Sequence, residues 1–195
     1  MGNAGLRNNY LVTLVKFILF LVIFCFLIKL GKEFWKEIRG EEGFKMSVLY
    51  MSVLFSFMFY TFIADLNDFY KKVQRFFFRS SFVSFLVPSV LVLLGIGYFL
   101  MPKIFGFSFN KDTFVFLGGF VLTAHLNFVA RETKGHTFNT FINYLFVFSI
   151  LCIINLLLFV VYLKVAFNVH IGEIFVGGLK QSVVLINSLF SRMFY

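Results

Sequence analysis

The chain has 195 residues, of which 60% are hydrophobic, and its mean hydropathy is +0.91. A water-soluble domain of this length has too small an interior to bury so much apolar surface, so we predict an integral membrane protein. The formal charge of +9 comes largely from residues that flank the apolar blocks, which favours contact with anionic lipid head groups and argues against nucleic-acid binding.

The first apolar block predicts a transmembrane helix over residues 10–30. This block is longer than a typical signal-peptide core and no small-residue cleavage motif follows it, so we expect the helix to be retained. Lys16 lies about two turns from its start, from where the ammonium is expected to reach the membrane surface.

An amphipathic segment follows over residues 29–39, and Trp35 within it suits an anchor at the membrane interface. Its apolar residues recur every four positions: Leu30, Phe34 and Ile38. This period predicts a helix that either continues the first span or lies on the membrane surface. Lys29 and Glu33 are four residues apart and are expected to pair on this helix.

The second predicted span covers residues 46–64. Ser52, Ser56 and Tyr60 are spaced by four and so share one face, which favours close packing against a neighbouring helix over a substrate path. The basic loop that follows carries four cations suited to anionic lipid: Lys71, Lys72, Arg75 and Arg79.

The third predicted span covers residues 82–101. Pro88 falls in its second turn, where it is tolerated or produces a kink, and Pro102 is expected to end the helix. Gly95 thins the helix and allows a neighbour to approach closely.

The fourth and fifth spans are predicted over residues 113–130 and 138–164. Gly118 and Gly119 make a second thin, helix-packing position in the fourth span. Asn155 lies well inside the fifth, where a buried amide needs a partner, so we expect it to bond to a neighbouring helix.

The tail over residues 171–194 is amphipathic, with apolar side chains on one helical face and Lys180 near its middle. Because a lipid-exposed lysine at mid-span is costly, we favour an interfacial helix over a sixth span. The fold class is therefore an all-α integral membrane protein, a single domain of five transmembrane helices, or six in the alternative, with amphipathic interfacial helices. Cys25 and Cys152 lie inside apolar blocks and are expected to be free thiols.

Polar residues gather at the junction of the fourth and fifth spans: His125, Asn127, Arg131, Glu132, Lys134 and His136. They form the candidate head-group or polar site of the chain. Their spacing matches no metal-binding motif, and the chain lacks the motifs of nucleophilic hydrolases and phosphate-binding loops. We therefore predict no catalytic residue, no metal and no cofactor. A basic interfacial loop is the main interpretation, and a lipid head-group site is the alternative.

The run KGHTFNTFINYLF, the long apolar helix after it and the final amphipathic block resemble the C-terminal half of Yip1-type multi-pass membrane proteins. The resemblance covers about 60 residues of the C-terminal part. It implies about five spans and a non-enzymatic scaffold or trafficking role, and it supplies no functional residue.

Polar residues inside the membrane are scarce, whereas thin and amphipathic helix faces are plentiful. This balance predicts a non-enzymatic subunit or scaffold of a larger membrane complex, bound to anionic lipids and other membrane subunits, in the bacterial cytoplasmic membrane. One alternative is a small transporter or channel component with a path along Ser52, Ser56, Tyr60 and Asn155. The other alternative is a lipid-binding or lipid-modifying protein.

Overall fold

The computed structural model describes residues 3–62, 66–78, 80–106, 109–133 and 138–194, and these ranges contain eight helices and no strand. The helices are α1 (Asn3–Gly40), α2 (Met46–Phe62), α3 (Leu66–Phe77), α4 (Ser81–Leu86), α5 (Ser89–Phe105), α6 (Lys111–Thr133), α7 (Phe138–Lys164) and α8 (Ile171–Phe194). The all-helical class predicted from the sequence is confirmed for this part of the chain.

Three described helices are long and apolar enough to cross a membrane, in α1 over Leu11–Gly40, in α6 over Lys111–Glu132 and in α7 over Phe141–Lys164. The helices α2 and α5 are also apolar but have only 17 residues each. A span of the hydrocarbon core takes about 20 residues. The chain thus has the helices of a membrane protein, while the count of five or six spans stays a prediction.

The helix α1 is continuous over 38 residues, or about 57 Å at 1.5 Å per residue. The amphipathic segment over residues 29–39 lies in the second half of this helix, so it continues the first span, which was one of the two interpretations. The apolar residues of the segment are buried against other helices: Leu30, Phe34 and Ile38. Gly40 ends the helix, and Gly43 takes a φ of +79° in the turn that follows.

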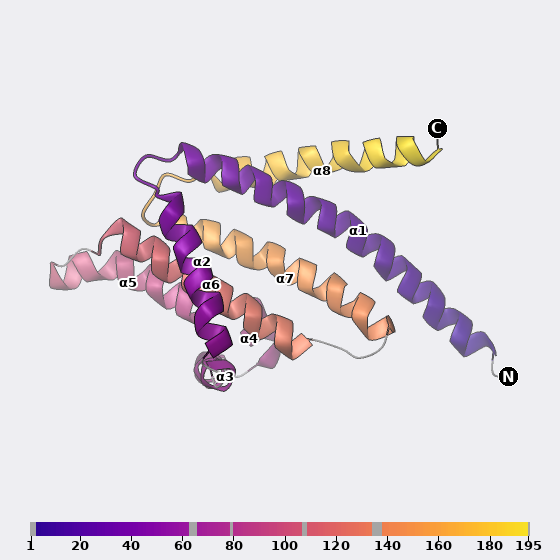
Figure 1. Cartoon of the computed structure of the whole chain (residues 1–195), viewed down its shortest axis with the longest axis horizontal. Helices are drawn as coiled ribbons and strands as arrows, with labels where there is room; N and C mark the ends of the chain where they lie inside the picture. Colours follow the sequence, from indigo (N-terminus) through magenta and orange to yellow (C-terminus); the bar gives the residue numbers. More distant parts are fainter. Residues whose placement is uncertain (1–2, 63–65, 79, 107–108, 134–137, 195) are drawn as a thin grey trace.

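Two helices pack along α1 (Figure 1). The helix α7 runs in the same direction, and the rings of Phe34 and Phe159 meet with centroids 6.0 Å apart. The helix α8 runs back along α1, where Gly178 lies against the backbone of Leu30. At this contact the Gln181 Nε2 donates a hydrogen bond to a Glu33 carboxylate oxygen. The expected pairing of Glu33 with a lysine of its own helix is replaced by this bond between helices.

The predicted third span is divided in two at Pro88. Val87 is extended, and α5 starts directly after the proline, which lacks the N–H that a continuous helix would need. The predicted end at Pro102 is wrong, because α5 continues to Phe105. A proline one turn from the end costs a single hydrogen bond, and Gly106, with a φ of +65°, terminates the helix instead.

The helix α3 forms within the segment that the sequence presented as a basic loop. Tyr70 and Gln74 are one turn apart and fully packed on the bundle, whereas Lys72 and Arg75 are exposed. Apolar residues recur at helical spacing over these 12 residues, so the sequence carried the pattern of an amphipathic helix that its basic residues obscured.

Two predicted polar contacts differ in the structure. Lys16 Nζ donates to Asn143 Oδ1 of α7 at 2.8 Å, so its ammonium bonds to a helix and does not simply extend to the membrane surface. Asn155 Nδ2 donates to the Leu151 carbonyl oxygen of its own helix at 2.8 Å, not to a neighbouring helix. The i−4 carbonyl is always within reach of a short polar side chain on a helix, which explains this choice.

Candidate functional site

A buried hydrogen-bonded network surrounds His125 of α6, which has no exposed surface. The Tyr70 hydroxyl of α3 lies 3.1 Å from His125 Nδ1, and Gln74 Nε2 donates to that hydroxyl oxygen at 2.9 Å. On the other side of the ring, His125 Nε2 lies 3.1 Å from the Phe85 carbonyl oxygen of α4. One imidazole therefore joins three helices.

The partners of His125 assign its tautomer. Because a carbonyl oxygen only accepts, the Nε2 of His125 carries the proton and donates to Phe85, which leaves Nδ1 to accept from Tyr70. Burial raises the pKa of the Tyr70 phenol, so this hydroxyl keeps the proton that it donates. Gln74 Oε1 is the one atom of the network that is buried without a hydrogen-bond partner in the described chain. The network is therefore uncharged and buried where α3, α4 and α6 meet.

The other residues of the predicted polar site lie nearer the end of α6. The Arg131 guanidinium lies 4.9 Å from the centre of the Tyr60 ring, and Glu132 accepts hydrogen bonds of 2.8 and 2.9 Å from Lys71 Nζ. Asn127 is half-buried. His125 is six residues from Arg131, about 9 Å along the helix, so the structure separates an enclosed histidine from a charged helix end.

Lys134 and His136, also predicted for this site, lie outside the described residues. Within the described part, no group of three or more His, Cys, Asp or Glu side chains could hold a metal ion. The exposed chemistry of the described junction is thus an arginine on an aromatic face and the ion pair of Lys71 with Glu132.

The predicted packing face of α2 lies against α6. Ser52, Ser56 and Tyr60 are all buried, and Ser56 Oγ donates to the Phe120 carbonyl oxygen at 3.1 Å. Gly119 is where the helices approach most tightly, because a Cβ built on it would lie 2.1 Å from Ser52 Oγ. A serine and a glycine at this contact remove the side-chain bulk that would hold the helices apart.

A second close contact is centred on Tyr162 of α7, which the sequence analysis did not single out. Its ring stacks on Phe114 of α6 with centroids 3.9 Å apart, and its hydroxyl donates to the Phe114 carbonyl oxygen at 2.7 Å. The ring occupies the space beside two glycines, with Cβ positions 2.2 Å away for Gly118 and 3.4 Å for Gly95. The detectable signal was a tyrosine near the end of an apolar helix, since a buried phenol needs a hydrogen-bond partner.

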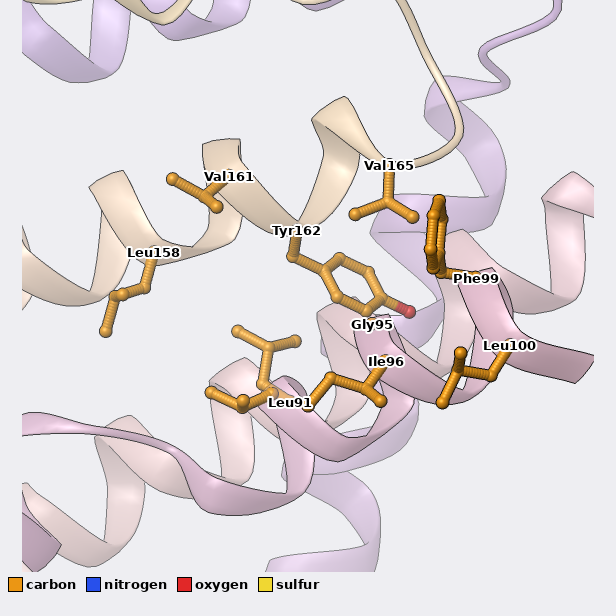
Figure 2. Close-up of a pocket in the computed structure, with 10 residues that line it drawn as sticks. Leu91, Gly95, Ile96, Phe99, Leu100, Leu158, Val161, Tyr162 and Val165 are labelled. Atoms are coloured by element: carbon orange, nitrogen blue, oxygen red, sulfur yellow. The ribbon is translucent and has the colours of Figure 1, made fainter.

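An apolar groove of about 360 Å³ lies between α5 and α7 (Figure 2). Its lining is Leu91, Val92, Gly95, Ile96, Phe99, Leu100, Leu158, Val161, Tyr162 and Val165. Because the Tyr162 hydroxyl is bonded to Phe114, the groove offers almost no polar group to a ligand. Lys103 lies beyond this lining, with its ammonium 3.9 Å from the centre of the Phe99 ring.

No protein-family model, no curated protein and no solved structure matches this chain. The resemblance to Yip1-type proteins therefore stays a prediction.

Proposed function

We propose that the protein is a non-enzymatic membrane subunit that binds a partner protein through the first half of α1. The observation that supports this is the exposure of that half. Its most apolar 18-residue window has a mean hydropathy of 3.0 and none of its residues buried, compared with 56% buried for α6 and 28% for α7. The most apolar 18-residue window among the three long apolar helices thus contributes no buried residue to the chain's own core.

The exposed half of α1 offers a surface of large side chains. Leu14 and Ile18 are one turn apart and about half-exposed. The rings of Phe20 and Phe24 contact each other with centroids 5.5 Å apart, so the aromatic side chains form a continuous ridge. In Figure 1 this half extends past the start of α7, and Lys16 within it bonds to Asn143 of that helix. Lipid tails can cover such a ridge, but a partner helix covers it with additional packing contacts.

The proposal is tested by placing a photo-crosslinking amino acid at Leu14 or Ile18 in the native membrane. The matched control is Leu54 of α2, which is equally apolar and exposed at 59%. We expect one protein adduct from the two α1 positions and none from the control. The same protein should co-purify in a fixed ratio with the unmodified chain. Lipid adducts alone at all three positions, together with a particle that holds only this chain, would refute the subunit role.

A further inference from the structure

The helices α1 and α8 pack tightly at one end and separate at the other (Figure 1). The tight end is at Gly178, where a Cβ would lie 3.1 Å from the Leu30 Cα. Next to this contact is a cleft of about 420 Å³, lined by Lys29 of α1 and by Lys180, Gln181, Val184, Leu185 and Ser188 of α8.

Two cations line this cleft. Neither Lys29 nor Lys180 has an ion pair in the described part of the chain. The Glu33 carboxylate lies one turn from Lys29 and accepts a hydrogen bond from Gln181, a neutral amide that also lines the cleft. The two lysines outnumber this carboxylate, so an anion in the cleft is favoured.

Polarity changes along the cleft. Its cationic end is at Lys29 and Lys180, and Val184 and Leu185 follow along α8 toward the end where the helices diverge. Ser188 lies about one turn further, with its hydroxyl bonded to the Leu185 carbonyl oxygen. A volume of about 420 Å³ suits a small ligand, whereas a partner helix has a diameter of about 10–12 Å and would need the helices to separate further. An anionic head attached to an apolar tail matches both ends of this cleft.

We infer that the α1–α8 cleft binds an anionic phospholipid. Its phosphate lies between Lys29 and Lys180, and one acyl chain runs along Val184 and Leu185. This site is separate from the polar junction at His125 and does not depend on the partner-binding role of the exposed half of α1.

The test uses the full chain in mild detergent, with phosphatidylglycerol and phosphatidylcholine of identical acyl chains added at equal concentration. Native mass spectrometry measures the affinity for each lipid. We expect the Lys29→Gln/Lys180→Gln variant to lose roughly 30-fold in affinity for phosphatidylglycerol and little for phosphatidylcholine, since each lysine near an anionic lipid contributes about a factor of five.

The matched control is Lys32→Gln/Lys36→Gln, which removes the same charge from exposed positions of α1 that do not line the cleft. This control should keep the preference for phosphatidylglycerol, and Lys29→Arg/Lys180→Arg should keep it as well. Equal affinity of the unmodified chain for the two lipids would overturn the inference. An equal loss in the control variant would also overturn it, because generic surface charge would then explain the binding.

Discussion

At the residue scale, the absence of a side chain matters as much as its presence. Gly118 and Gly119 are adjacent, yet they serve different helices, because successive residues of a helix point about 100° apart. Gly118 gives space to the Tyr162 ring of α7, and Gly119 gives space to Ser52 of α2. The pair lets α6 lie at the centre of the bundle in close contact on two sides.

We expect Gly118→Ala to destabilise the protein by about 1–3 kcal/mol, because the added Cβ would lie 2.2 Å from Tyr162 and displace the ring. The control is Gly97→Ala in α5, where nothing lies within 4 Å of the Cβ position. That substitution should leave stability unchanged or raise it by about 0.5–1 kcal/mol through helix propensity. Thermal unfolding in detergent measures both, and equal effects would contradict the packing assignment.

A second residue-scale prediction concerns the buried network. Tyr70→Phe removes the hydroxyl that donates to His125, so we expect a loss of about 1–3 kcal/mol from unpaired buried atoms. Tyr50→Phe is the control, since Tyr50 is exposed at 49% and packs by its ring on Trp35. Denaturant or thermal unfolding gives the difference. Unchanged stability in Tyr70→Phe would show that the network does not hold α3 on the bundle.

At the element scale, the paired helices α1 and α8 show how a charged helix face is used in a contact between helices. Glu33 in the second half of α1 bonds to Gln181 of α8, and Glu37 bonds to the backbone and imidazole of His170, the residue just before α8. These contacts give the two carboxylates hydrogen-bond donors from the protein. On an isolated surface helix, water would supply those donors. The contact also fixes the direction of α8 relative to the rest of the fold.

The close approach at Gly178 can be tested directly. Gly178→Leu should force α8 away from Leu30 and destabilise the protein by about 1–3 kcal/mol, whereas Gly172→Leu, where the Cβ position is open, should not. Spin labels at positions 32 and 176, in a chain without its two cysteines, should report a longer and broader distance distribution in Gly178→Leu alone. An unchanged distribution would mean that the helices do not depend on this contact.

At the scale of the whole molecule, the direction of the helices sets where the chain ends. The helix α8 begins where the second half of α1 finishes and runs back along it, so the start of α1 and the end of α8 lie at the same end of the molecule (Figure 1). We expect reporter tags before α1 and after α8 to appear on the same side of the membrane. Opposite sides would instead support five spans followed by an interfacial tail.

Much of the element pattern could be predicted from the sequence, because long apolar runs have few structural solutions in lipid. The ranges 46–64, 113–130 and 138–164 differ from the ends of α2, α6 and α7 by only a few residues. The candidate site was less predictable. Sequence proximity grouped His125 with Arg131 and Glu132, but a helix carries residues six apart to different depths and faces, and the fold buried the first and exposed the others.

The sequence by itself determined the helical class, the long apolar segments and the small residues able to form close contacts, because composition and hydrophobic periodicity are local properties of the chain. Only the tertiary structure decided which groups meet. Gln181 reaches Glu33 across 148 positions, and Lys29 and Lys180 come to line one cleft. Such pairings depend on how whole helices pack, because the residues that pair lie far apart in the sequence.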